Sequence, residues 1–202
     1  MTNSTERRKE YPARMFYRAT VTCPSCFKKS RDASERCSAC GFDALQAVQK
    51  FQFTPPTLDC VIDSAGLLDE KTIERITLTA QTLKAKFPQF GFYFCLVDMG
   101  NTVNLSEFAF WMMNACRLQD GQTEMDRAWS VLLVIDSVSG QVALTPGYAA
   151  EAFIEDSGWE AAIRDISPLL REAQYGDAIL NYLTHAEKLL HTAALFVKGK
   201  LK

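Results

Sequence analysis

The sequence predicts an α/β fold, in which a mixed sheet is sandwiched between helices, with a small zinc-ribbon module at the N-terminus. Continuous apolar runs at 92–97 and 130–135 indicate strands that are covered on both faces. Around these runs, apolar residues recur every three or four positions, as they do in amphipathic helices. Two Cys-x-x-Cys motifs near the N-terminus indicate a metal-stabilised module in front of this body.

Start and stop signals define the helices of the body. Asp69 can cap a helix over about 70–87, and Pro88 ends it. Asn104, with Glu107 three residues later, forms a cap-like start to a second helix. The other predicted elements are a turn over 136–140, a hairpin strand over 141–145, and helices over 149–156, 159–171 and 175–197.

Four cysteines are predicted to bind one structural zinc ion, and they are Cys23, Cys26, Cys37 and Cys40. Zinc favours four thiolates in a tetrahedron, and two Cys-x-x-Cys turns supply them. The ten residues between the motifs are too few and too polar to form a core, so the metal has to stabilise the module. Gly41, directly after the second motif, permits a positive φ beside the metal. Iron also accepts four thiolates and stays open as the alternative metal.

Disulfides and redox-active pairs are the other interpretations of these motifs. Disulfides require an oxidising compartment, but residues 1–9 are polar and charged and lack the apolar segment of a secretory signal. A thioredoxin-like pair requires a βαβ context, which residues 10–50 lack. The expected location is therefore the cytoplasm. The other cysteines are predicted to pack as small hydrophobic residues, and they are Cys60, Cys95 and Cys116.

A stiff, extended break over residues 54–57, which contains Pro55 and Pro56, is predicted to separate the N-terminal module from the body. On this division we expect the ribbon and the body to unfold separately. The predicted parts are a flexible arm over 1–12, the zinc ribbon over 13–42 with its first strand over 15–21, a linker over 43–57 and the α/β domain over 58–197.

Charge is divided unevenly along the chain. Residues 1–50 hold ten Lys/Arg against five Asp/Glu, whereas the remainder holds twelve against nineteen. A basic head with aromatic residues suits phosphate contacts and base stacking, and the acidic remainder limits any such binding to weak nucleic-acid binding. The residues concerned are Arg14, Arg18, Lys28, Lys29, Arg31 and Arg36, beside Phe16, Tyr17 and Phe27. No apolar run approaches the ~18 residues of a membrane span, so no transmembrane segment is expected.

Several short segments of the body occur in an order and spacing that resemble the TPM domain family. They are an acidic residue followed by Ala-Gly-Leu-Leu at 63–68, the apolar strand at 131–136, a turn similar to Gly-Tyr-Gly-x-Glu at 147–151, an acidic step at 154–156 and a closing segment at 166–175. The resemblance covers about residues 58–192 and implies the TPM fold. Ala149 departs from the pattern, since the family usually has a second glycine there.

The resemblance also implies a candidate acidic site. Some members of the family are acid phosphatases, and some bind divalent cations through acidic residues. Asp63 and Asp156 match the acidic positions, and we add Asp136 and Asp98 because each follows a buried strand. Clustered carboxylates favour a hard cation, so the predicted ligand of Asp63, Asp136 and Asp156 is calcium or magnesium. The alternative interpretation is that these aspartates are turn and cap residues.

The sequence is therefore compatible with three functions for this protein. The leading hypothesis is a non-catalytic interaction or scaffold protein with an unknown protein partner, because no nucleophile or general base is evident. The second is a divalent-cation-dependent phosphatase of the TPM type, which uses the three aspartates. The third is weak nucleic-acid binding through the basic ribbon. No catalytic residue is assigned from the sequence.

Overall fold

The structure is a computed structural model that describes residues 21–30, 36–154 and 156–200 of the 202-residue chain. Side chains are described at these positions except at 21, 30, 156 and 196–200. The predicted arm over 1–12 lies outside the described residues, as does the predicted ribbon strand over 15–21 apart from its last residue. The described part of the ribbon contains a pair of antiparallel strands, β1 (Val21–Thr22) and β2 (Lys29–Ser30), and both cysteine turns.

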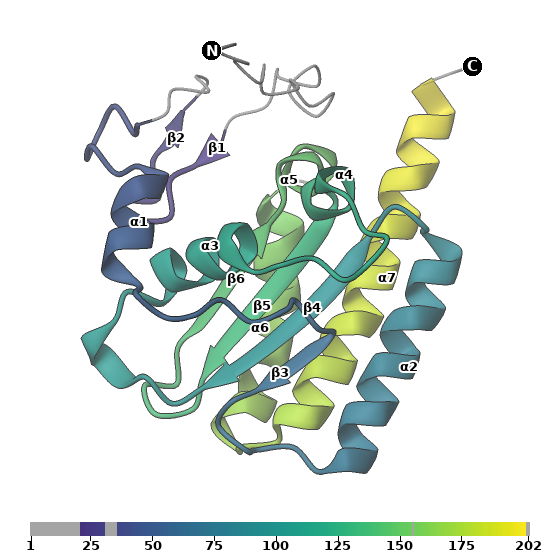
Figure 1. The fold of residues 1–202 in the computed structure, drawn as a ribbon. Coiled ribbons are helices and arrows are strands. Elements are labelled where there is room, and N and C mark those ends of the chain that lie inside the picture. Colours follow the sequence, from purple (N-terminus) through teal and green to yellow (C-terminus); the bar gives the residue numbers. More distant parts are fainter. Residues whose placement is uncertain (1–20, 31–35, 155, 201–202) are drawn as a thin grey trace, which may run out of the picture.

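A four-stranded mixed sheet forms the centre of the body (Figure 1). Its strands, in spatial order, are β3 (Val61–Asp63), β4 (Gly91–Val97), β5 (Ser130–Asp136) and β6 (Val142–Pro146). The first three run parallel, and β6 pairs antiparallel with β5 through the predicted hairpin. The predicted mixed sheet is thereby confirmed.

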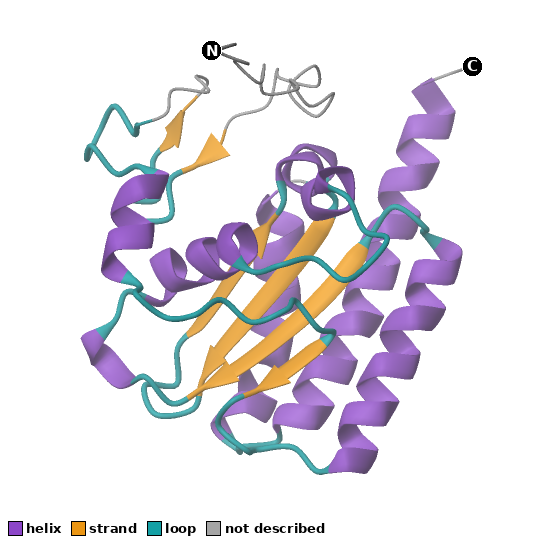
Figure 2. Cartoon of the chain, viewed as in Figure 1, coloured by secondary structure: helices purple, strands orange, loops and turns teal. Residues whose placement is uncertain are grey.

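Helices cover both faces of this sheet, as predicted (Figure 2). One face carries α2 (Glu70–Lys86), α6 (Asp156–Arg171) and α7 (Tyr175–Lys200). The other face carries α3 (Leu105–Ala115), and α1 (Ala44–Lys50) packs on α3. The shorter elements are η2 (Gly100–Thr102), α4 (Glu124–Ala128) and α5 (Tyr148–Phe153). Helix α6 begins three residues before its predicted start, and α4 was not predicted from the sequence.

Side-chain alternation along β4 divides the interior into two cores. Phe94 and Leu96 face α2, α6 and α7, whereas Cys95 and Val97 face α3. All four side chains are buried, which explains why β4 is a continuous apolar run. We call the second of these the α3 core: the buried residues between the sheet, α3 and the N-terminal module.

The predicted linker over 43–57 contains helix α1, which is docked on α3. Asp43 caps this helix by accepting a hydrogen bond from the backbone N–H of Gln46 at 2.8 Å. Ala47 and Phe51, one turn apart, are buried in the α3 core. A seven-residue helix is too short for apolar periodicity to reveal, and it is stabilised by this packing. Buried residues of the N-terminal module and of α1 therefore belong to the same core as the inner face of α3.

Candidate metal centre

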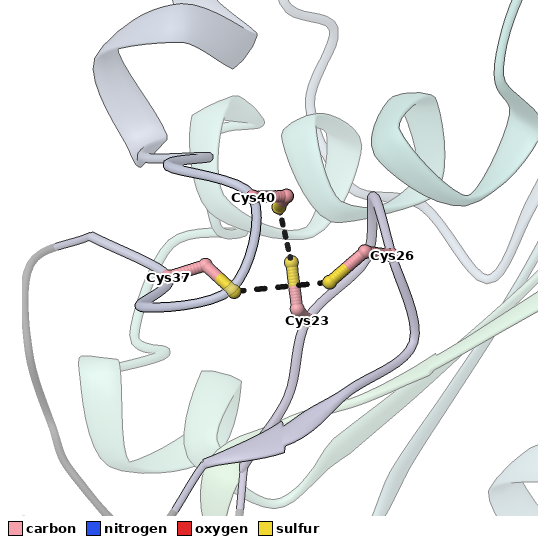
Figure 3. A group of neighbouring side chains, drawn as sticks. All are labelled: Cys23, Cys26, Cys37 and Cys40. Carbon is pink, nitrogen blue, oxygen red and sulfur yellow. Dashed lines mark hydrogen bonds between the residues drawn. The ribbon is translucent and has the colours of Figure 1, made fainter.

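Two turns bring the four predicted zinc ligands together, one turn after β1 and one before α1 (Figure 3). Their sulfur atoms all lie within 4.8 Å of one another. Cys23 Sγ is 3.7 Å from Cys40 Sγ, and Cys26 Sγ is 3.8 Å from Cys37 Sγ. Four sulfurs at the usual Zn–S distance of ~2.3 Å lie ~3.8 Å apart in a tetrahedron. The quartet therefore has the size of a tetrahedral thiolate site and can bind a metal ion, consistent with zinc.

The two Cys-x-x-Cys turns share one backbone arrangement. In each, the N–H of the residue after the second cysteine donates to the carbonyl of the first: Phe27 to Cys23 at 2.9 Å, and Gly41 to Cys37 at 2.8 Å. Both donors have positive φ, 58° at Phe27 and 77° at Gly41. The positive φ expected at Gly41 is thus confirmed, and Phe27 adopts it in the first turn.

The pKa values of Cys23, in the first turn, and Cys37, in the second, are shifted in opposite directions. The backbone N–H of Cys40 donates toward Cys37 and contributes most to lowering the pKa of that thiol to about 6. Burial raises the pKa of Cys23 to about 12. Because a metal binds the thiolate, Cys37 is already in its binding form at neutral pH, whereas Cys23 has to lose a proton when the metal enters.

The module is attached to the body on both sides of the quartet. On the β1 side, the backbone N–H of Thr22 donates to Glu151 Oε1 in α5 at 3.0 Å. On the α1 side, the rings of Phe42 and Phe110 meet edge-on with their centroids 5.6 Å apart. These contacts join the metal-binding turns to elements from distant parts of the chain.

Helix α1 adds an ion pair and an aromatic cluster to this attachment. Lys50 Nζ lies 2.7 Å from Glu107 Oε2, and the Glu107 side chain is only 10% exposed. The Phe51 ring contacts both Phe108 and Trp111 on α3, with centroids 5.5 and 5.8 Å apart respectively. The pairing of Lys50 with Glu107 could not be predicted from the sequence, because residues 57 positions apart leave no local signal.

The two described carboxylates of the predicted calcium or magnesium site lie on opposite faces of the sheet. Asp63 pairs with Leu96 on β4 and so faces the α2 side. Asp136 pairs with Val97, which faces α3. Within the described part of the chain, the cysteine quartet is the only group of three or more Cys, His, Asp or Glu side chains placed to hold a metal. The structure therefore does not bring Asp63 and Asp136 together.

Asp136 is a turn residue in this structure. Its Oδ1 accepts from the backbone N–H groups of Met99 at 3.0 Å and Val138 at 3.2 Å, and its Oδ2 accepts from the hydroxyl of Ser139 at 2.6 Å. Burial opposes ionisation, but these hydrogen bonds hold the pKa of Asp136 below its usual range. The carboxylate thus fixes the loop after β4 against the β5–β6 turn.

The other three predicted aspartates have different surroundings. Asp63 Oδ2 accepts from the backbone N–H of Leu68 at 2.7 Å, while its Oδ1 is buried without a hydrogen-bond partner among the described residues. Asp98 is exposed directly after β4. Asp156 is the first residue of α6, but its side chain is outside the described part, so its convergence with Asp63 stays a prediction.

The fold and the cysteine quartet define the protein as an α/β domain with an N-terminal module that can bind a metal. Residues 61–189 match the family model of the TPM domain. The match spans more than half of the chain, which therefore belongs to the TPM domain family. No curated protein matches the chain. In the described ranges, no helix combines the length and the apolar character needed to cross a membrane.

Two solved structures are similar to this chain. The solution structure of the N-terminal domain of cg2496 protein from Corynebacterium glutamicum is 15% identical, with a TM-score of 0.51, and the match covers 64% of this chain and 78% of that one. The N-terminal domain of a protein from P. gingivalis is 18% identical, with a TM-score of 0.49 and coverage of 73% and 88%. At this level of identity, the first of these similarities supports the fold alone.

Proposed function

We propose that this protein is a non-catalytic interaction protein in which one zinc ion stabilises an N-terminal ribbon docked on a TPM domain. The observation that carries the proposal is the position of the quartet at the edge of the α3 core, where Cys23 is buried together with Phe42. Four thiolates from the chain complete a tetrahedron and leave no open position for water or substrate. The metal therefore has a structural role and supports the surface that the ribbon and the TPM domain present together.

Zinc fits this role better than a redox-active ion. None of the seven cysteines forms a disulfide, which suits a reducing compartment such as the cytoplasm, our proposed location. Elemental analysis of protein prepared without chelator tests the assignment, and we expect about one zinc per chain. Iron in place of zinc, or neither metal, would reject it.

Two charged side chains near the ends of the sheet, Asp136 and Arg127, make structural hydrogen bonds, which supports a non-catalytic role. The Asp136 carboxylate is engaged by three internal hydrogen bonds. The Arg127 guanidinium donates to the carbonyl oxygens of Met113 and Cys116 and so caps the C-terminal end of α3. Phosphoryl transfer needs cationic donors aimed at the developing charge, and Arg127 is committed to this structural contact instead.

One observation favours the alternative, a divalent-cation-dependent phosphatase of the TPM type. Asp63 Oδ1 is buried without a hydrogen-bond partner in the described part of the chain, and a buried carboxylate oxygen in that state suits a cation. In this alternative, Asp63 and Asp156 bind calcium or magnesium, whereas Asp136 is not a ligand and keeps its hydrogen bonds in the β5–β6 turn.

An aryl phosphate assay with added calcium or magnesium decides between the two functions. We expect negligible turnover by the zinc-loaded chain, and the same background from Asp156→Asn. Robust turnover that disappears in Asp156→Asn, while Asp98→Asn as a matched surface control keeps it, would make the phosphatase the function. The interaction role is tested by cross-linking in cell extract, where we expect the wild-type chain to capture a protein that Cys37→Ser does not.

A further inference from the structure

We infer that the groove between the first cysteine turn and the TPM domain binds a base of a single-stranded nucleic acid. The groove is open, with a volume of about 420 Å³. Phe27 lines it on the ribbon side, and residues 101–106 with Gln141 and Val142 line it on the side of the body. The inference goes beyond the proposed function, because it identifies a class of partner and the residues that contact it.

Phe27 has an unusual conformation and an exposed ring. Its φ of 58° is rare for a bulky side chain, and the second turn has Gly41 at the same position with a φ of 77°. The Phe27 side chain is 63% exposed, so little burial compensates for this backbone strain. An exposed aromatic ring at the edge of a groove is a surface on which a planar base stacks.

The opposite wall of the groove offers neutral hydrogen-bonding groups. Gln141 Nε2 donates to Asn101 Oδ1 at 3.4 Å, and both carboxamides line the groove. Carboxamides carry donors and acceptors side by side, which is the pattern that the edges of bases present. No charged side chain is among the lining residues, so this groove suits an uncharged planar group rather than a phosphate.

The phosphates of such a ligand would lie outside the groove, beside the residue that follows Phe27 in the first cysteine turn. Lys28 follows Phe27 directly and is exposed. Residues 1–50 carry ten Lys/Arg against five Asp/Glu, which attracts a polyanion. A single strand fits this arrangement better than a duplex, because the bases of a duplex are already stacked and their faces are not accessible to Phe27.

Fluorescence anisotropy of a labelled ten-nucleotide oligouridylate, titrated with the zinc-loaded full chain at 50 mM salt, tests the inference. The informative variant is Phe27→Gly, because glycine accepts the positive φ and keeps the turn and its cysteines intact. We expect this variant to bind the oligonucleotide about tenfold more weakly, and Phe27→Tyr to bind as the wild type does. Leu78→Ala is the matched control, since Leu78 is 65% exposed on α2, on the other face of the sheet.

Two further measurements separate base recognition from charge alone. Lys28→Gln should reduce the slope of log affinity against log salt by about one, because one phosphate contact is lost. Duplex of the same length and inorganic polyphosphate should compete at least tenfold less well than the single strand. Equal competition by polyphosphate, unchanged binding by Phe27→Gly, or no binding by the wild type would each overturn the inference.

Discussion

The ring of Phe42, two residues after Cys40 of the cysteine quartet, contacts the ring of Phe110 on helix α3 edge-on, with the centroids 5.6 Å apart. Phe42 is buried in the same core as Cys23, Ala47 and the inner face of α3. The turn that follows Cys40 and the inner face of α3 therefore pack in one core. We expect a metal bound by the quartet to stabilise the TPM domain as well as the ribbon.

Phe42→Ala tests this packing contact. We expect the substitution to lower the free energy of unfolding of the zinc-loaded chain by ~3 kcal/mol, because a buried ring leaves a cavity. Urea denaturation followed by circular dichroism measures the change. Leu45→Ala is the control, since Leu45 is 64% exposed on α1 and its truncation should change stability little. A Phe42→Ala chain as stable as the control would show that the ribbon does not contribute to the body.

Zinc affinity is expected to rise with pH. The Cys23 thiol, with a pKa raised to about 12 by burial, is protonated without metal and loses its proton on binding. Each displaced proton makes the apparent affinity roughly tenfold stronger per pH unit. Below about pH 6 the Cys37 thiol is protonated as well, so the dependence should steepen there. Competition with a chromophoric chelator between pH 5.5 and pH 8 measures this, and a flat profile would contradict it.

Glu151→Gln tests the attachment of β1 to α5. The carboxylate of Glu151 accepts from the N–H of Thr22 at 3.0 Å, and an amide oxygen accepts the same bond without the charge. We expect a loss of ~1 kcal/mol in unfolding free energy and faster hydrogen exchange at Thr22. Zinc content should not change, since Glu151 is not a ligand. Exchange at Thr22 as slow as in the wild type would show that this bond contributes nothing to docking.

Asp136→Asn tests the structural role of that aspartate. The pKa of Asp136 is lower in the folded protein than in the unfolded chain. The ionised carboxylate therefore stabilises the fold fully above the usual carboxyl pKa, and this stabilisation is lost as the pH falls through the pKa of the folded state. We expect Asn to cost ~1–3 kcal/mol at pH 7 and progressively less below about pH 4. Unfolding free energies of the two proteins across this range measure the effect. A difference that stays constant down to pH 2 would exclude the carboxylate charge as its source.

Local signals in the sequence predicted the longer helices and the two central strands of the body. The Asp69 cap is confirmed by the hydrogen bond from the N–H of Thr72 to its Oδ1 at 2.7 Å, and the Asn104 cap by bonds from the N–H groups of Ser106 and Glu107. The buried strands β4 and β5 follow their apolar runs almost to the residue. In each case the physical cause lies within a few residues of the feature it determines.

The features that the sequence did not reveal depend on distant contacts. Helix α1 is too short to show periodicity, and its packing depends on rings of α3 such as Phe108. The opposite orientations of Asp63 and Asp136 depend on strand register, which a single sequence does not specify for parallel strands separated by long connections. The grouping of the four cysteines was predictable because their spacing within each turn is itself the signal.

Removal of zinc, followed by hydrogen–deuterium exchange, tests whether the metal stabilises α3 as well as the ribbon. Exchange is compared between the zinc-loaded chain and the same chain after chelation, with zinc re-addition as the reversal control. We expect chelation to accelerate exchange in α1 and in the 105–115 segment of α3, while the 178–190 segment of α7, on the other face of the sheet, keeps its protection. Unchanged exchange in α3 after complete zinc removal would contradict the account, because it would show that the metal stabilises the ribbon alone.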